Sequence, residues 1–230
     1  MIVAIHQPQY LPWLGYFDKM DQADAFCYLD NVQFKKNEWQ NRNRVKTASG
    51  WQWLTVPVQY KFPQKIIDVT VNDAVKWQHK HMQALITNYK RAPFFDEYFP
   101  IFESAFQHEF DAISDVNIHM ATQIREILGI NHKPIIRSSE LALSNDPTGR
   151  LIDICNYLNG DAYLAGQDGV KYMDMNQFVE AGIEVNTQMY HHPEYPQRFG
   201  EFQSHMSIID LVFNCGPESL AIIRKGRKNG

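Results

Sequence analysis

Cysteine is scarce in this sequence. Its 230 residues include three cysteines, Cys27, Cys155 and Cys215, with no CxxC spacing. An odd number without paired spacing argues against a disulfide framework or a four-cysteine zinc site, and favours a reducing compartment. No apolar run approaches the roughly 20 residues that cross a bilayer, and MIVAIHQ opens on an apolar stretch without a basic leader. We therefore expect a cytoplasmic protein that is neither exported nor embedded in a membrane.

Common motifs for nucleotide binding and for zinc binding are also missing. The sequence contains no GxGxxG and no GxxxxGK[ST], so neither a dinucleotide fold nor a P-loop has support. Its histidine pairs, His79 with His81 and His191 with His192, lack the HExxH spacing of zinc enzymes, and no metal site is expected. The net charge of −4 excludes a global attraction to nucleic acid or to an anionic membrane.

Apolar and aromatic residues are plentiful, at 44% and 13% of the chain. A chain of this size and composition can bury one large core. No repeat, low-complexity tract or flexible linker divides it. We expect one domain over residues 1–230, with a helical segment at about 74–129 as a subdomain.

The pattern along the chain predicts an α/β fold with a parallel or mixed sheet, flanking helices and a helical insertion. It opens with a strand, a loop, a helix and a strand, and then strand 51–59 pairs with strand 66–71. Three helices follow within 74–129, the last capped by Ser114 and stopped by Gly129. Strands and helices then alternate, and the basic end 224–230 is expected to be a solvated terminus. The remaining ranges are strands 2–6, 24–30, 133–141, 161–166 and 183–190, and helices 14–22, 147–160, 175–182 and 207–225.

The loop after the first strand, HQPQYLPW, is stiff and crowded with rings and amides. Ligands of α/β sheets sit beyond the carboxyl ends of strands, so this loop is a candidate site. His6 is a candidate general base or orienting donor, the alternative being an imidazole bonded only to backbone. Gln7 can recognise hydroxyls, amides or a base edge. Tyr10, Trp13 and Tyr16 either form a stacking platform for a sugar or nucleobase or belong to the core.

A second candidate loop, AGQDGVKY, leaves the strand at 161–166. Gly166 and Gly169 would let backbone N–H groups approach an anion, the alternative being a tight turn. Asp30, at the carboxyl end of the second strand near Gln33, is the candidate catalytic acid.

The segment of residues 35–46 is basic, although the chain as a whole has a net charge of −4. Lys36, Arg42 and Arg44 with Trp39 could clamp a diphosphate while a ring stacks, and Asn43 adds a neutral hydrogen-bonding group. The alternative is a solvated charged face.

Five blocks carry a resemblance to a known family: HQPQYLPWLGYFDKM, ADAFCYLDNVQFKKNEWQNRNRVKT, NYKRAPFF, YLAGQDGVKYMD and HPEYPQRFGEFQSHMSIIDLVFNCGPE. In this order they resemble the WbqC-like family of bacterial proteins over nearly the whole chain. Ala165 stands where the family usually has a serine. The resemblance adds Tyr195, Gln197, Ser207, Asp210 and Asn214 to the candidate binding residues.

The resemblance implies a place in O-antigen, lipopolysaccharide or other surface-polysaccharide biosynthesis. It suggests a transferase that adds an acyl or aminoacyl group to the amine of an amino sugar or of a nucleotide-linked amino sugar. A nucleotide or sugar is then the small-molecule ligand. No motif demands a cofactor; a coenzyme A thioester or other activated acyl donor would supply the group. Enzymes of a surface-glycan pathway are the implied partners, and a homo-oligomer stays open.

Two alternatives remain. A non-catalytic nucleotide-sugar binding protein, accessory to a partner transferase, would equally lack a triad or a carboxylate pair. The opening strand, His-containing loop, helix and strand also resemble nucleotidylyltransferase-like folds, in which a loop histidine meets the triphosphate at a helix N-terminus. Here only His6 is present where that motif has two histidines, so this remains a fold analogy.

Overall fold

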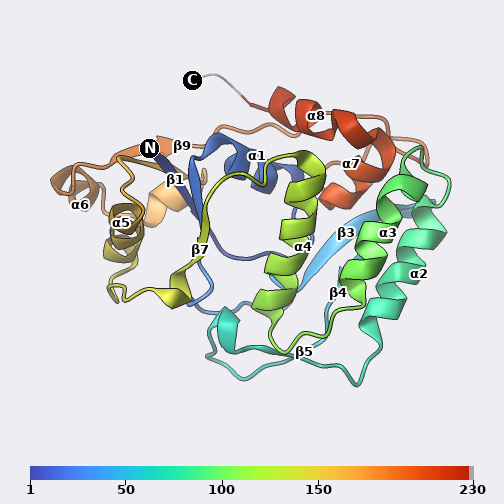
Figure 1. Ribbon diagram of the computed structural model, residues 1–230, viewed down its shortest axis with the longest axis horizontal. Coiled ribbons are helices and arrows are strands. Elements are labelled where there is room, and N and C mark those ends of the chain that lie inside the picture. Colours follow the sequence, from blue (N-terminus) through green and yellow to red (C-terminus); the bar gives the residue numbers. More distant parts are fainter. Residues whose placement is uncertain (228–230) are drawn as a thin grey trace.

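A five-stranded parallel sheet forms the centre of the protein, seen in a computed structural model that describes residues 1–227 (Figure 1). Its strand order is β7-β2-β1-β8-β9, and every neighbouring pair is parallel. This confirms the expected α/β class. The strands are β1 (Ile2–His6), β2 (Ala25–Tyr28), β7 (Ile135–Arg137), β8 (Ala162–Ala165) and β9 (Glu184–Thr187).

The order of the strands reverses at β1. The chain runs from β1 through helix α1 (Leu14–Gln22) to β2 and later adds β7 on that side, whereas β8 and β9 lie on the other side. Connections therefore leave the sheet in opposite directions next to the carboxyl ends of β1 and β8. In open α/β sheets this switch point is where a crevice for a ligand forms.

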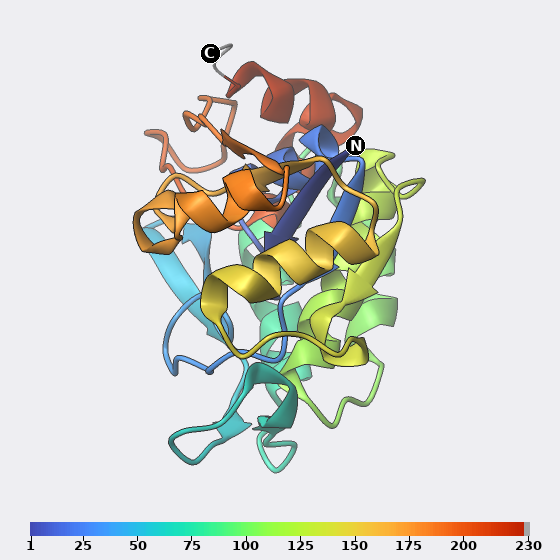
Figure 2. The same ribbon diagram turned by 90° about the vertical axis from the view of Figure 1, so that its left-hand side faces the viewer.

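Both faces of the sheet are buried, as the apolar strand sequences predict for a parallel sheet. Val3 and Ile5 of β1 pack in one core with helices α5 (Pro147–Tyr157) and α6 (Met175–Glu180), while Ala4 faces a larger core. Figure 2 shows α5 and α6 on the near side of the sheet, with the other helices behind it.

The larger core joins α1 to the helices of the middle and the end of the chain. The predicted trio within 74–129 is confirmed, and Gly129 ends the last helix in a left-handed conformation with φ 71°. Ser114 is not the N-cap: Ala112, two residues earlier, holds that position, and Ser114 is fully buried in the first turn. These helices are α2 (Trp77–Tyr89), α3 (Phe95–Phe106), α4 (Ile113–Leu128), α7 (Ile208–Cys215) and α8 (Ser219–Lys225).

The expected pairing of 51–59 with 66–71 is largely wrong. Strand β4 (Gly50–Thr55) pairs instead with β3 (Arg42–Thr47), within the basic segment, as an antiparallel hairpin. Only the short strands β5 (Val58–Gln59) and β6 (Thr70–Val71) pair as predicted. The hairpin of β3 and β4 forms in place of the predicted pairing because Gly50, at φ 120°, lets the chain reverse after Thr47.

The basic end of the chain is not simply solvated. Arg224 Nε lies 2.8 Å from Asp21 Oδ2, and Arg227 Nε lies 2.6 Å from Asp18 Oδ1. Arg227 also pairs with Asp21 through its second nitrogen. Both acids are buried on α1, so the arginines neutralise charges that would otherwise be costly. The last part of the predicted terminus, 228–230, lies outside the described residues.

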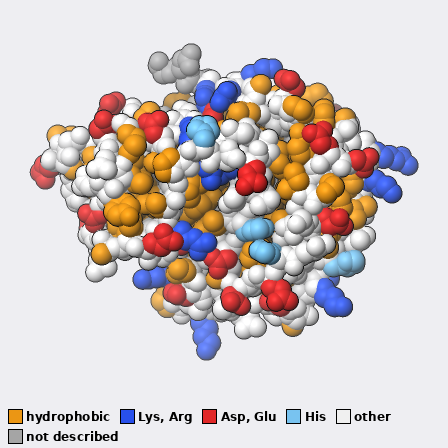
Figure 3. Space-filling view, in the orientation of Figure 1, with side chains coloured by type: hydrophobic (Ala, Val, Ile, Leu, Met, Phe, Trp, Pro, Cys, Tyr) orange, Lys and Arg blue, Asp and Glu red, His pale blue; other side chains and the backbone are white. Residues whose placement is uncertain are grey.

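No helix within residues 1–227 is long and apolar enough to cross a membrane. On the face shown in Figure 3, acidic and basic side chains are interspersed with exposed apolar ones.

Candidate functional site

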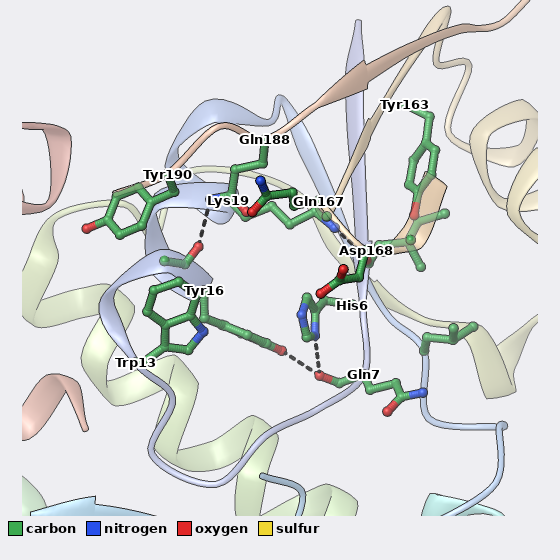
Figure 4. A pocket seen from close by; sticks show the side chains of 15 residues that line it. His6, Gln7, Trp13, Tyr16, Lys19, Tyr163, Gln167, Asp168, Gln188 and Tyr190 are labelled. Atoms are coloured by element: carbon green, nitrogen blue, oxygen red, sulfur yellow. Dashed lines mark hydrogen bonds between the residues drawn. The ribbon is translucent and has the colours of Figure 1, made fainter. Parts of the chain in front are cut away.

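A cavity of about 430 Å³ opens at the switch point of the sheet, between the ends of β1 and β8 (Figure 4). This volume lies within the range of small-molecule sites. The walls come from the first loop, α1, the loop after β8 and the chain leaving β9. The lining residues are Ile5, His6, Gln7, Trp13, Gly15, Tyr16, Lys19, Leu29, Tyr163, Gly166, Gln167, Asp168, Gly169, Gln188 and Tyr190.

The first loop keeps its shape through buried amide side chains. Asn43 donates to the backbone oxygens of Tyr10 at 3.3 Å and Leu11 at 2.8 Å. Asn117 of α4 donates to that of Pro8 at 3.2 Å. Loop carbonyls without strand partners would otherwise be buried unsatisfied. The loop is therefore a rigid part of the cavity wall, although Leu11 has φ 43°.

Trp13 lies across the first turn of α1 because Gly15 has no side chain. A Cβ at Gly15 would stand 2.3 Å from the indole ring. The ring of His205 stacks on this indole, with centroids 5.4 Å apart and planes at 24°. Trp13 thus forms an aromatic rim to the cavity.

His6 ends β1 and faces the cavity. Its Nδ1 lies 3.0 Å from the backbone oxygen of Gln7, which also accepts a hydrogen bond of 3.1 Å from the Tyr16 hydroxyl. Burial and then the nearby Lys19 ammonium lower the pKa of His6 to about 3. The ring is therefore neutral at pH 7. With Nδ1–H donating to Gln7, Nε2 holds the lone pair and can accept a proton.

Lys19, on α1, is the buried basic group of the cavity. Its Nζ donates 2.9 Å to the backbone oxygen of Ile5 and lies 5.8 Å from the ring centre of Tyr163. Only 2% of the side chain is exposed, and no carboxylate of residues 1–227 pairs with it. Burial lowers its pKa to about 7. An ammonium in this setting lacks the counter-charge that buried cations usually have.

The wall opposite the first loop is held by Gln188, just past β9. Its Nε2 donates to the backbone oxygen of Gly15 at 2.8 Å and to Asp18 Oδ2 at 2.7 Å. Asp18 is the acid that pairs with Arg227, so the end of the chain supports this wall.

The loop after β8 closes the cavity with Gly166, Gln167, Asp168 and Gly169. It turns through a hydrogen bond of 2.9 Å from Gly169 N to Gly166 O, which fits the tight-turn interpretation. The Asp168 carboxylate lies on the rim, 2.7 Å from Lys171 Nζ.

Five of the predicted site residues therefore line the cavity, namely His6, Gln7, Trp13, Tyr16 and Gly166. Others are fully buried elsewhere. Tyr10 places its hydroxyl 2.7 Å from His81 Nδ1, and Asn43 holds the loop. Asp30 accepts hydrogen bonds from Ser138 and from the backbone and hydroxyl of Ser139, all at 2.8–3.0 Å, at the ends of β2 and β7.

The predicted C-terminal group forms a second buried cluster. Asp210 accepts hydrogen bonds from the hydroxyls of Tyr89 at 2.7 Å and Tyr195 at 2.9 Å, and burial raises the pKa of its carboxyl. Asn214 donates 2.7 Å to the backbone oxygen of Asp210, while the Ser207 side chain caps the start of α7. These contacts join α2 to α7 and lie outside the cavity.

The remaining predicted residues are at the surface or on the hairpin. Gln33 and Lys36 are exposed on the connection before β3. The side-chain amide of Gln197 forms hydrogen bonds with the backbone N and O of Gln203 and so stabilises its own loop. Trp39 and Arg42 surround Trp53, with the Arg42 guanidinium 4.1 Å from that ring centre. None of these residues lines the cavity.

Sequence reasoning named the candidate loop AGQDGVKY without singling out its Gln167 and Asp168. It missed four other lining residues, Lys19, Tyr163, Gln188 and Tyr190. A usable signal existed for Lys19, which follows Tyr16 by one helical turn and so shares its face of α1. Gln188 follows a strand of the parallel layer, and such positions gather at the same edge of the sheet.

Within residues 1–227, no cluster of three or more His, Cys, Asp or Glu side chains could hold a metal ion, and all three cysteines are buried and free. Fold and cavity together define an α/β protein with a ligand-sized site at the switch point of a parallel sheet.

The chain belongs to the WbqC-like protein family, whose profile matches residues 7–222. It is 36% identical over 233 residues to a Mycobacterium tuberculosis (strain ATCC 25618 / H37Rv) protein named "Uncharacterized protein Rv1507c", covering 98% of this chain and 99% of that one. No solved structure matches the chain.

Proposed function

We propose that this protein is a transferase that binds a nucleotide-linked amino sugar in the switch-point cavity and adds an acyl or aminoacyl group to its amine. The observation that carries the proposal is Lys19, a buried ammonium on the cavity wall that pairs with no acid of residues 1–227. Its one hydrogen bond to an acceptor of the described residues leaves two N–H groups for a ligand. A phosphate would supply the missing counter-charge.

The rest of the cavity suits the sugar end of such a ligand. Trp13 offers a ring on which a sugar or base can stack, and Gln7 presents an amide. The Asp168 carboxylate on the rim can hold an amine. A cation, an acid and a neutral imidazole around one cavity match a ligand that carries both phosphate and an amino group.

His6 would accept the proton in the transfer step. The amine nitrogen attacks the carbonyl carbon of an activated acyl donor such as a coenzyme A thioester. The C–N bond forms, the C–S bond breaks, the thiolate leaves, and the amine proton passes to His6 Nε2 before it reaches the thiolate. An anionic ligand beside Lys19 offsets the charge that helps to lower the pKa of His6, and so makes the imidazole a stronger base.

A thermal-shift panel tests the binding step. Nucleotides, nucleotide-linked amino sugars, coenzyme A thioesters and nucleoside triphosphates with magnesium are compared on the wild type, Lys19→Met and the exposed-lysine control Lys61→Met. A ligand at about 100 times its Kd stabilises by roughly 2.7 kcal/mol and raises Tm by about 5–11 °C. The shift should survive Lys61→Met and vanish in Lys19→Met. A flat panel on the wild type would remove the proposal.

A second measurement separates catalysis from binding. Amide formation is followed by mass spectrometry with His6→Gln, which keeps a side chain able to bond to Gln7. Loss of turnover with retained binding supports the role of His6 as base. Stable binding without conversion by any donor would indicate an accessory binding protein, and magnesium-dependent release of pyrophosphate would indicate nucleotidyl transfer.

A further inference from the structure

The outer face of the β3–β4 hairpin carries an unusual group of side chains. The strand register places Arg44 opposite Trp53 and Arg42 opposite Thr55, with Trp51 on the same face. The Arg44 guanidinium lies 5.1 Å from the ring centre of Trp51 and 5.9 Å from that of Trp53, while Arg42 lies 4.1 Å from Trp53. These are cation–π distances, so rings and cations form one layer.

The rings of this layer remain accessible. Trp51 is 42% exposed and Trp39, which packs beside Trp53 with centroids 5.7 Å apart, is 37% exposed. Large apolar rings are rarely left at the surface in a group unless they bind something. We call this group, Trp39, Arg42, Arg44, Trp51 and Trp53, the hairpin platform.

The cations of the platform lack acids. Neither Arg42 nor Arg44 forms an ion pair within residues 1–227, and the Nε atom of each is buried without a hydrogen-bond partner there. Of the six residues that the strand register places on this face, none is Asp or Glu, and Lys46 is buried and donates to the backbone oxygen of Glu201. Arg44 has one hydrogen bond, from its Nη2 to the backbone oxygen of His205, and the remaining guanidinium donors of Arg42 and Arg44 have none within residues 1–227. A planar fork of such donors matches a carboxylate.

An aromatic path connects the platform to the cavity. Trp13 lines the cavity and stacks on His205, and Arg44 donates 3.3 Å to the backbone oxygen of His205. In Figure 2 the hairpin, in light blue, lies on the same side of the molecule as the orange and red coil between β9 and α7. A ligand leaving the cavity over Trp13 would therefore meet the platform next.

We propose that the hairpin platform is a second binding site, which takes an acidic saccharide chain. Pyranose rings stack on the exposed faces of Trp39 and Trp51, and uronic carboxylates pair with Arg42 and Arg44. The choice of a saccharide rests on the proposed function, whereas the site itself is separate from Lys19 and His6.

Other occupants fit the platform less well. A two-fold contact with a second copy would set the platform against itself, guanidinium facing guanidinium. A partner protein of standard size needs roughly 20–30 residues a side, far more than the six on this face. A nucleic acid needs a row of phosphate contacts along an extended basic surface, and this chain carries a net charge of −4.

Tryptophan fluorescence and calorimetry test the platform with a short oligogalacturonate as the probe, and a neutral malto-oligosaccharide of equal length as the comparison. The variants are Arg42→Gln and Trp51→Ala, with the exposed aromatic control Phe62→Ala. We expect saturable binding of the acidic probe alone, weakened at least about tenfold by Arg42→Gln or Trp51→Ala and unchanged by Phe62→Ala. Binding should also persist in Lys19→Met.

Three results would overturn the inference: no saturable binding, equal binding of the neutral probe, or tighter binding of a poly-uridine oligonucleotide than of the uronate. A wild-type dimer in light scattering that Trp51→Ala dissociates would assign the platform to self-association instead. Because Lys19→Met removes only the cavity ligand, failure of the cavity proposal would leave oligogalacturonate binding intact, and failure here would leave the nucleotide-sugar shift intact.

Discussion

The ammonium of Lys19 donates its hydrogen bond to the backbone oxygen of Ile5, 2.9 Å away, and so stands beside His6 at the end of β1. A helix side chain thereby caps a strand end that faces the cavity. The protonation states of Lys19 and His6 are therefore coupled, because the charge on Lys19 helps to lower the pKa of His6 and to keep its ring neutral.

Binding of a phosphorylated ligand should take up a proton. The pKa of Lys19 is lowered to about 7 by burial, so at pH 8 most molecules hold a neutral amine. A bound phosphate favours the charged form and raises that pKa, so up to one proton enters on binding. Calorimetry at pH 8 in buffers of different ionisation enthalpy measures the uptake.

The uptake should shrink at pH 6, where Lys19 is already charged. Equal uptake at pH 6 and pH 8 would show that another group takes the proton.

Gly15→Ala should disturb the cavity without touching a polar group. The new Cβ would stand 2.3 Å from the Trp13 ring, so the indole must move. Overpacking of this kind costs about 1–3 kcal/mol and should change Trp13 fluorescence and weaken the cavity ligand. For the changes in stability and fluorescence, Gly166→Ala is the matched control, since a Cβ there meets nothing within 4 Å. Similar losses in both variants would contradict the steric explanation.

Asn43→Leu should lower the free energy of unfolding by about 2–4 kcal/mol, because two buried loop carbonyls lose their donor. Urea denaturation measures the change, and the exposed Asn145→Leu serves as the control. If Asn43 instead contacts ligand directly, the variant will keep its stability and lose affinity.

Stability should fall as the pH drops below about 6.5. Burial lowers the pKa of His6 to about 3, and those of His81 and His192 to about 4. Between about pH 6.5 and 4 the unfolded chain binds protons at these positions that the folded chain does not, so acid favours unfolding. Tm measured from pH 7 to 4.5 should decline, and the slope should be shallower in His81→Gln. An unchanged slope in that variant would exclude His81 as a contributor.

The sequence predicted the part of the site that follows from strand ends. Strand 2–6 and helix 14–22 were placed at their observed bounds, and His6, Gln7 and Trp13 lie where a switch-point argument puts them. Lys19 was missed because a single lysine in an amphipathic helix looks solvated, and its burial depends on β8 and β9, which pair near β1 from far along the chain.

Residue type alone could not separate binding groups from internal ones. Asp30, Asn43 and Asp210 have the chemistry of ligand contacts, yet their hydrogen bonds are made with Ser138, the first loop and two tyrosines. The hairpin was missed for a related reason. The alternation in RNRVKT places cations on one face, but the basic segment was interpreted as a diphosphate clamp or a solvated face because the tryptophan partners of its cations lie on the other strand.

The pair of Asp18 and Arg227 joins positions separated by 209 residues, and Asp18 in turn holds Gln188 in the cavity wall. A nascent chain leaving the ribosome exposes α1 early, with two acids whose partners are synthesised 203 and 209 residues later. We expect the growing chain to remain unable to hold its ligand until Arg224 and Arg227 have emerged. Chains arrested before residue 224 should then fail to bind, and binding by such chains would show that the wall forms without its arginines.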